Sequence, residues 1–396
     1  MPAASGTLTA TAVKLDGQVY ASPIIVNGTV IVATENNVVY GLNTAGQQRW
    51  RVQLGTPTPS SALACGNIEP IGITGTPVYD AATDTVFAVT STGSAVIQTL
   101  IGIDPAKGAV RFRRPIAFPG VDPNAMQQRG ALAVTGGSVW IPFGARAGDC
   151  GNYKGRVVGI PTSATGDQVY YSPETRRGGG MWNPMGVVVN SAGHLMVVSA
   201  NGAAFPGDEY DHTNSLLELD ATRLVDSFAP SDWAENNRGD VGLGSQSPAL
   251  VGDKWIFIGG KSMTSYVLRQ GKLGGISGEV ATGDFCRSFG GTAVSGSTVY
   301  VPCTDGVRSV SISAGGVPTV NWHADSSVAG SPVVGGGRVY ALDQSGGVLH
   351  ALDPASGRTR EQVRVGTTSR FATPAVSGGK LFVPTLTGLT IVDTDG

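Results

Sequence analysis

The sequence predicts an all-β protein, an eight-bladed β-propeller built from four-stranded antiparallel blades. Three observations support this prediction: a glycine-rich composition, a recurring module of short strands, and a spacing of the modules that closes into a ring. Glycine supplies 58 of the 396 residues, about double the usual share of roughly 7%. Long stretches with helical periodicity are absent. Short alternating strands joined by tight glycine turns are typical of propeller blades.

The clearest copy of the module spans residues 329–365. It starts with Gly330-Ser331-Pro332, continues as alternating strands at 338–342 and 348–352, and ends with an outer strand near Val365. Turns rich in glycine and aspartate join these strands, as in an antiparallel meander. This copy therefore predicts one complete blade.

A Ser-Pro or Thr-Pro dipeptide starts five modules, and degenerate copies start three more. The first residues are Ser22, Thr76, Ala131, Met185, Ser247, Gly291, Ser331 and Thr373. Successive starts are 40 to 62 residues apart, and the step from Thr373 through both chain ends to Ser22 is of similar size. The predicted blades within this single domain, residues 1–396, are 20–54, 73–115, 128–172, 182–230, 244–281, 288–324, 329–366 and 371–396.

Seven blades is the alternative, if the irregular third module is an insertion. Eight blades require Trp140 and Val158 to lie on neighbouring strands of one sheet. The last module lacks an outermost strand, and residues 7–13 form a spare strand before the first module. We expect residues 7–13 to complete the last blade, which removes two exposed sheet edges; a frayed tail is the alternative. Helix is expected only as short turns near 54–72, 115–128 and 222–240.

Three turns resemble the blade-docking motif of the quinoprotein-dehydrogenase-like propellers, Ala-x-Asp-x-x-x-Gly-x-x-x-Trp. They lie at residues 41–50, 102–108 and 351–357. In that motif the Asx side chain caps the turn, the glycine is left-handed and the tryptophan packs between blades. Only Trp50 keeps the tryptophan, and Phe112 lies near its place in the second copy. We therefore expect the packing between blades to be partly aliphatic.

A closer resemblance covers most of the chain. Segments 72–80, 178–182 and 199–202 are similar to exported bacterial proteins with pyrroloquinoline-quinone-binding-like propeller repeats. This resemblance implies the fold, and it carries no demonstrated activity.

The four cysteines fall in loops predicted to lie on one face of the ring, called the top face. Of the three possible pairings, we predict Cys286–Cys303 and Cys65–Cys150. Disulfides imply an oxidising compartment, and the start Met1-Pro2-Ala3-Ala4 is typical of a chain from which a leader was removed. We therefore expect a secreted or extracytoplasmic protein. The alternatives are four free thiols in a cytosolic protein, or a zinc cluster, although no Cys-x-x-Cys spacing occurs.

Composition excludes several partners. Charged residues make up 14% of the chain, and its net charge is −2, so nucleic acid is not an expected partner. No apolar run approaches the roughly 18 residues that a membrane span requires. A closed ring has no open sheet edge, so we expect a monomer.

The family resemblance implies a quinone held above calcium, beneath adjacent cysteines, with a tryptophan below it and an aspartate base. The chain has no adjacent cysteine pair and no assignable calcium set, and its nearest candidates are Trp182 and Asn183. We therefore expect no quinone cofactor, while calcium stays open. A separate insertion carries Asp208, Glu209, Asp211 and His212. We expect a solvated, hydrogen-bonded loop, because contiguous residues rarely converge on one ion. The alternative is that these residues bind a divalent cation or supply a lyase base.

Aligning the module starts places one ring of residues at the top mouth of the channel: Tyr20, Thr74, Arg129, Asn183, Ser245, Phe289, Ala329 and Phe371. The candidate ligand-binding residues are Tyr20, Arg129, Trp182, Asn183, Gln246, Arg287 and Arg370. The three arginines predict a cationic collar, and Trp182 a stacking surface, for a small anionic or sugar-like ligand. The alternative is that each arginine pairs locally.

The blade geometry is well specified, while no catalytic set is. The sequence therefore favours an extracellular ligand- or protein-binding propeller scaffold without a quinone site. An enzyme of the hydrolase, lyase or biosynthetic type, using a top-face pocket, is the first alternative. A quinoprotein dehydrogenase is the second.

Overall fold

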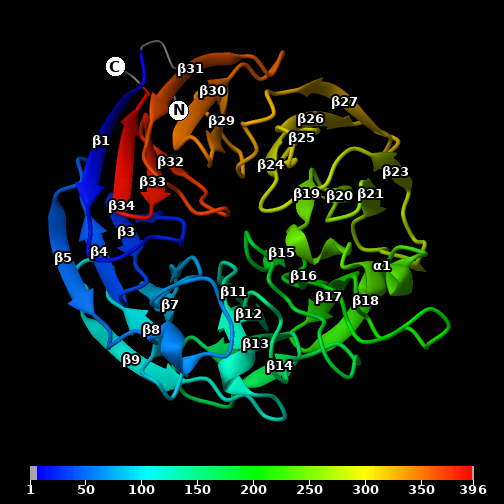
Figure 1. Ribbon diagram of the computed structural model, residues 1–396, viewed down its shortest axis with the longest axis horizontal. Coiled ribbons are helices and arrows are strands. Elements are labelled where there is room, and N and C mark those ends of the chain that lie inside the picture. The colour runs from blue at the N-terminus through cyan, green and yellow to red at the C-terminus, as the bar shows by residue number, and fades with distance from the viewer. Residues whose placement is uncertain (1–6, 395–396) are drawn as a thin grey trace.

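The computed structural model describes residues 7–394, which form eight β-sheets arranged in a ring around a central axis (Figure 1). The all-β prediction is confirmed, and so is the number of blades. Trp140 lies in β12 and Val158 in β13, and these two strands pair in one antiparallel sheet. The third module is therefore a blade. Residues 1–6 and 395–396, which include the end of the predicted eighth blade, lie outside the described residues.

The strands of each blade run in chain order from the channel outward. Blades one to three contain β2 (Ile24–Val26), β3 (Thr29–Ala33), β4 (Val38–Leu42), β5 (Gln48–Gln53), β6 (Val78–Asp80), β7 (Thr85–Thr92), β8 (Ile97–Ile103), β9 (Val110–Pro115), β10 (Met126–Gln128), β11 (Ala133–Thr135), β12 (Ser138–Ala145), β13 (Arg156–Pro161) and β14 (Val169–Tyr171). Blades four to six contain β15 (Val188–Val189), β16 (Leu195–Ser199), β17 (Ser215–Asp220), β18 (Arg223–Ala229), β19 (Ala249–Val251), β20 (Trp255–Ile258), β21 (Thr264–Arg269), β23 (Ala281–Asp284), β24 (Ala293–Ser295), β25 (Thr298–Val301), β26 (Arg308–Ile312) and β27 (Pro318–His323). Blades seven and eight contain β28 (Val333–Gly335), β29 (Arg338–Asp343), β30 (Val348–Leu352), β31 (Thr359–Arg364), β32 (Ala375–Ser377), β33 (Lys380–Thr385), β34 (Gly388–Asp393) and β1 (Thr9–Lys14).

Two blades depart from the four-stranded plan. In blade three, β10 and β11 both pair with β12, and residues 129–132 between them leave the ladder at the channel side. In blade four, the short strand β22 (Gly275–Ile276) of the following module pairs in parallel with β18. The bulge in blade three matters for the site, because it carries Arg129.

The N-terminal strand closes the ring, as predicted. β1 pairs with β34 from Thr9 opposite Asp393 to Lys14 opposite Gly388, and Figure 1 shows this blue strand beside the red last strand. The preceding Leu8 is buried, and its backbone amide donates to a Glu361 carboxylate oxygen at 3.0 Å. The two ends of the chain therefore share one sheet, and β1 covers the edge of β34.

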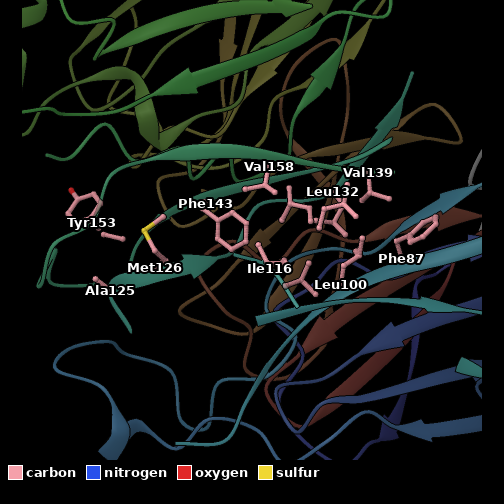
Figure 2. Close-up of a cluster of buried hydrophobic side chains, with 14 residues drawn as sticks. Phe87, Leu100, Ile116, Ala125, Met126, Leu132, Val139, Phe143, Tyr153 and Val158 are labelled. Atoms are coloured by element: carbon pink, nitrogen blue, oxygen red, sulfur yellow. The ribbon is translucent and has the colours of Figure 1, made fainter. Parts of the chain in front are cut away.

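Apolar clusters between neighbouring blades hold the ring together. Figure 2 shows one of them, in which Phe87 and Leu100 of blade two pack against Val139 and Phe143 of blade three. Each other pair of adjacent blades shares a similar cluster, made mostly of Val, Leu, Ile and Ala. Burying one such side chain contributes about 1.5–3 kcal/mol. The expected aliphatic packing is thus confirmed.

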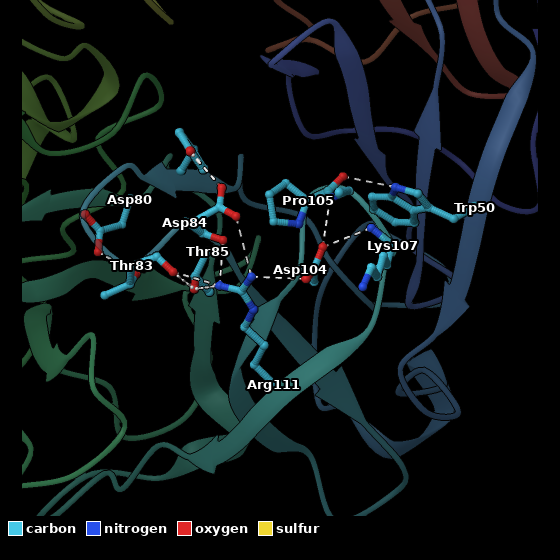
Figure 3. Close-up of polar contacts among 11 residues, drawn as sticks. Trp50, Asp80, Thr83, Asp84, Thr85, Asp104, Pro105, Lys107 and Arg111 are labelled. Atoms are coloured by element: carbon cyan, nitrogen blue, oxygen red, sulfur yellow. Dashed lines mark hydrogen bonds and ion pairs between the residues drawn. The ribbon is translucent and has the colours of Figure 1, made fainter.

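The docking motif joins blade one to blade two on the face opposite the top. The indole nitrogen of Trp50 donates to the Pro105 carbonyl at 3.0 Å, and the Asp104 carboxylate caps the turn by accepting from two backbone amides at 2.9 Å (Figure 3). Gly108 has a φ of +70°, and a Cβ on it would lie 2.4 Å from the Trp50 ring. Only glycine allows this approach.

Trp322 is a second docking tryptophan. Its indole nitrogen donates to the Pro354 carbonyl at 2.8 Å, and its ring packs on Gly357 of blade seven. This contact was not predicted, because Ser313 stands where the docking turn of Trp322's own blade would carry an aspartate.

Among the described residues, helix is confined to short segments. They are η1 (Ser60–Ala62), η2 (Pro123–Ala125), η3 (Leu243–Ser245) and α1 (Trp233–Gly239). Three of these fall in the predicted long connections, and η3 lies just beyond the last one. Within residues 7–394, no helix has the length and apolar character to cross a membrane.

Candidate binding cavity at the channel mouth

A cavity of about 220 Å³ lies at the top mouth of the channel. Two sets of residues form its wall. The first set precedes the inner strands and includes Tyr20, Thr74, Arg129, Ser245, Phe289 and Phe371. The second set follows the second strands and includes Ala145, Arg146, Ala200, Asn201 and Lys261. Loops before first strands and after second strands share the top face, so both sets meet at one mouth.

Hydroxyl groups at the blade starts fix the cavity rim. In three places the backbone amide at the start of one blade donates a hydrogen bond of about 3 Å to the hydroxyl at the start of the next blade. The pairs are Ser22 to Thr76, Met185 to Ser247, and Gly291 to Ser331. Met185 also crosses the channel, because a Cβ on Gly291 would lie 1.9 Å from its side chain and its sulfur accepts from Thr373. The recurring Ser or Thr therefore has a structural role in joining blades.

Arginine and phenylalanine alternate along one side of the cavity. The guanidinium carbon of Arg129 lies 4.7 Å from the centre of the Phe371 ring. That of Arg370 lies 3.9 Å from Phe289 and 6.0 Å from Phe371. Cation–π contacts of this kind orient the guanidinium groups, and they leave the arginines without a carboxylate partner among the described ion pairs.

Four of the seven candidate ligand-binding residues line this cavity: Tyr20, Arg129, Trp182 and Arg370. Trp182 is held in place, because its indole nitrogen donates to the Ala145 carbonyl at 3.0 Å. Its ring also covers Gly144, where a Cβ would approach within 2.4 Å. The structure brings these four residues together, and their role in binding stays a prediction.

Asn183, Gln246 and Arg287 are placed differently. Asn183 is fully buried, and its side-chain amide forms hydrogen bonds with the backbone amide and carbonyl of Val198. Gln246 is also fully buried, and its amide group contacts Gly259, Ser288 and Thr292. Arg287 is exposed, and its Nε donates to the Lys261 carbonyl at 3.1 Å. None of these three is among the described residues that line the cavity, so the expected three-arginine collar contains only Arg129 and Arg370.

Arg146 lines the cavity and was not predicted. Its side chain is 1% exposed, and its Nε donates to the Asn124 carbonyl at 2.5 Å. Both terminal nitrogens, Nη1 and Nη2, are buried and have no hydrogen-bond partner among the described residues. Burial lowers the pKa of Arg146 to about 10, against the attraction of Asp122. The guanidinium is therefore still charged at neutral pH.

Glu35 is a second unpredicted group, one hydrogen bond away from the cavity. It is fully buried, and one carboxylate oxygen accepts from the Gly72 amide at 2.7 Å and the Thr74 hydroxyl at 3.1 Å. Burial raises the pKa of Glu35 to about 7, while these two donors and the charge of Arg129 oppose the rise. The charge of Arg129 is thus close enough to act on Glu35, although no ion pair joins the two residues among the described contacts.

The proposed metal cluster does not form. Asp208, Asp211 and His212 are each engaged separately: Asp208 caps the Phe205 amide, Asp211 accepts from Thr213, and His212 pairs with Glu174 at 2.6 Å. Glu209 is exposed. Among residues 7–394 no group of three or more acidic, histidine or cysteine side chains is placed to hold a metal ion. These contacts are those of a hydrogen-bonded loop, in which each local turn uses its own carboxylate.

Both predicted disulfides are present beside the cavity. Cys65 pairs with Cys150, and Cys286 pairs with Cys303. The first bridge anchors the loop after Arg146, since Gly148 of that loop lies against Cys65 and lines the cavity. The second bridge lies next to Phe289, because Ser288 and Cys303 form a β-bridge. The bridges therefore fix two stretches of the cavity wall.

Comparison with known families shows the family of the chain. The family model described as outer membrane protein assembly factor BamB matches residues 3–205 and 270–396. The chain belongs to this BamB family. Comparison with curated proteins gave no match.

Solved structures share the BamB-family fold. BamB from Moraxella catarrhalis is 17% identical with a TM-score of 0.66, over 98% of this chain and 97% of that chain. Quinohemoprotein alcohol dehydrogenase from Comamonas testosteroni is 14% identical with a TM-score of 0.72, over 99% of this chain and 77% of that chain. The computationally designed Ika8 protein is 11% identical with a TM-score of 0.61, over 96% of this chain and 98% of that chain. At these identities the likeness concerns the fold alone, and it confirms the quinoprotein-like propeller resemblance.

Proposed function

We propose that this BamB-family chain is an extracytoplasmic binding scaffold that holds an acidic group of its ligand in the cavity at the channel mouth. The observation that carries the proposal is the charge of the cavity wall. Arg129, Arg146 and Arg370 line it without a carboxylate partner among the described ion pairs, and Lys261, which pairs with Asp240, and Asp149 also line it. The whole chain has a net charge of −2, so the positive potential is local. Such a cleft concentrates anions.

The size of the cavity limits the ligand. Its volume of about 220 Å³ is below the roughly 300–1,000 Å³ typical of sites for drug-sized molecules. A small organic acid, an acidic sugar, or one or two side chains of a protein partner would fit. The family description, an assembly factor for outer membrane proteins, favours a protein partner. Two disulfides support an oxidising, extracytoplasmic location.

The proposal includes the absence of a bound quinone. All four cysteines are in bridges between residues distant in sequence, so no adjacent pair is available to cover a quinone ring. Asn183, the nearest candidate for a calcium ligand, uses its side chain on the Val198 backbone. The residues present therefore do not fit that cofactor.

Thermal unfolding of the full chain with and without small anions tests the proposal. A ligand at about 100 times its Kd stabilises the native state by about 2.7 kcal/mol, which is a readily measured increase in Tm. We expect Arg370→Ala to abolish the increase. Arg287→Ala is the matched control, because Arg287 is an exposed top-face arginine outside the cavity wall. An equal loss in both variants would point to general surface charge and contradict the proposal.

A further inference from the structure

We propose that Arg146 and Gln127 form the deepest subsite of the cavity and receive the carboxylate group of the ligand. The inference rests on the proposed function and names the chemistry of the ligand: a small organic acid, or the carboxylate end of a peptide. Both side chains line the channel cavity and also a small polar pocket next to it. Gln127 lies on β10, which pairs with the end of β12 just before Arg146.

The subsite contains donors without acceptors. Nη1 and Nη2 of Arg146 and Nε2 of Gln127 are buried and have no partner among the described residues. Buried polar groups in native proteins are almost always hydrogen-bonded, and an unpaired buried charge is strongly destabilising. No acidic side chain of the described residues forms an ion pair with Arg146. The missing partner is therefore an acceptor that comes from outside the chain.

A buried water molecule does not meet this need. The small pocket has about 10 Å³, which is roughly the space for one water. One water offers two acceptor positions, whereas the two Nη atoms and the Gln127 amide carry six N–H bonds between them. Water also leaves the charge uncompensated. A carboxylate has two oxygens with about four lone-pair sites, and it matches the planar fork of a guanidinium.

The subsite is held rigidly in the wall of the cavity. The Arg146 Nε is fixed on the Asn124 carbonyl, and the loop that follows is held by the Cys65–Cys150 bridge. Ala147 and Gly148 of that loop line the cavity beside Arg146. The row of Arg129 and Phe371 also lines the cavity, so it can contact the rest of the ligand.

The test compares two buried arginines. Arg146→Met removes the subsite, and Arg156→Met is the matched control. Arg156 is 2% exposed, contacts the Pro119 carbonyl and the Tyr170 ring, and is not among the described residues that line the cavity. Gln127→Leu is a second variant at the subsite. Each protein is titrated, with Tm and Kd as readouts, against succinate, galacturonate, an N-acetylated tripeptide as free acid and as amide, and inorganic phosphate at matched ionic strength.

We expect at least one carboxylate to raise the Tm of the unmodified chain. Arg146→Met should weaken that binding by about 100-fold, since a bidentate charge-assisted pair is lost. Arg156→Met should leave it unchanged, and the tripeptide amide should not replace the acid. The ligand-free Tm of Arg146→Met should not fall, because the variant removes an unpaired buried charge. Gln127→Leu should weaken binding by about 10-fold.

Three results would overturn the inference. If a carboxylate binds and Arg146→Met retains its affinity while Arg370→Ala loses it, the cavity binds acids but Arg146 is not the subsite. If phosphate alone binds, the carboxylate assignment is wrong. If no anion shifts the unmodified chain, both this inference and the proposed function fail.

Discussion

Replacing Glu35 with glutamine should remove a pH dependence of stability that this one residue creates. Glu35 is fully buried, and burial raises the pKa of its carboxyl from the ordinary value of 4.5 to about 7. Between these two values the native state holds a proton that the unfolded state releases. The native state therefore loses stability as the pH rises from about 4.5 to about 7. This sign is opposite to that of a salt-bridged carboxylate.

The size of the effect follows from the shift. A displacement from 4.5 to about 7, at 1.36 kcal/mol per pKa unit, corresponds to about 3 kcal/mol. Glutamine has the shape of the protonated acid, and its carbonyl can still accept from the Gly72 amide and the Thr74 hydroxyl. Glu35→Gln should thus match the unmodified chain near pH 4.5. Its relative stability should then increase by about 1.4 kcal/mol per pH unit and level off above pH 7.

Urea denaturation at pH 5, 6, 7 and 8 measures this difference. The exposed Glu209→Gln is the control, and its stability should follow that of the unmodified chain at every pH. Parallel pH curves for Glu35→Gln and the unmodified chain would refute the reasoning. A variant that loses stability as pH rises would show instead that the ionised carboxylate pairs productively with Arg129 in the native state.

Three further predictions concern contacts that stabilise the ring of blades. Deleting residues 1–14 removes β1 and its ladder with β34, each bond worth about 0.5–1.5 kcal/mol net, so the Tm should fall by several degrees; an unchanged Tm would make that strand dispensable. Trp322→Phe loses the bond to the Pro354 carbonyl and should cost about 1 kcal/mol in urea denaturation, whereas an unaltered midpoint would contradict a docking role. Replacing Cys286 and Cys303 together by alanine opens a 17-residue separation and should cost about 3 kcal/mol; equal stability under reducing and non-reducing conditions in the unmodified chain would exclude that contribution.

The fold could be predicted because the residues that join neighbouring blades recur at fixed positions of the repeat. The hydroxyl of the Ser or Thr at a blade start can accept a hydrogen bond from the backbone amide at the start of the preceding blade. The Thr76 hydroxyl accepts from the Ser22 amide in this way. Each blade needs the same short strands and turns, so the signal recurs around the ring. Trp322 was not predicted because Ser313 stands in its own blade where the motif carries an aspartate, although Trp322 docks on the next blade as Trp50 does.

The cavity could be predicted only in part. Alignment of the blade starts gives the height of a residue along the channel, and it correctly placed Tyr20, Arg129 and Arg370 at the mouth. It does not give the direction of a side chain. Asn183 lies at the right height, but its backbone has a φ of +37° and its amide group turns back to Val198. Such turns depend on which backbone groups lack partners, and that information is tertiary.

The places of Arg146 and Glu35 on the top face could have been predicted from the strands that precede them, which the alignment of blade starts did not use. Each follows a second strand of small and apolar residues, and those ends share the top face with the blade starts. Lys261 and Asn201 occupy similar positions in blades five and four, and both line the cavity. A charged residue directly after a fully buried strand conflicts with local packing, because burial destabilises its charged form. Local conflicts of this kind are expected at functional sites.

The same two residues also carry buried atoms without partners, Nη1 and Nη2 of Arg146 and Oε1 of Glu35. A charged residue that follows a buried second strand is therefore a sequence signal for the top face that could be used beside the alignment of blade starts.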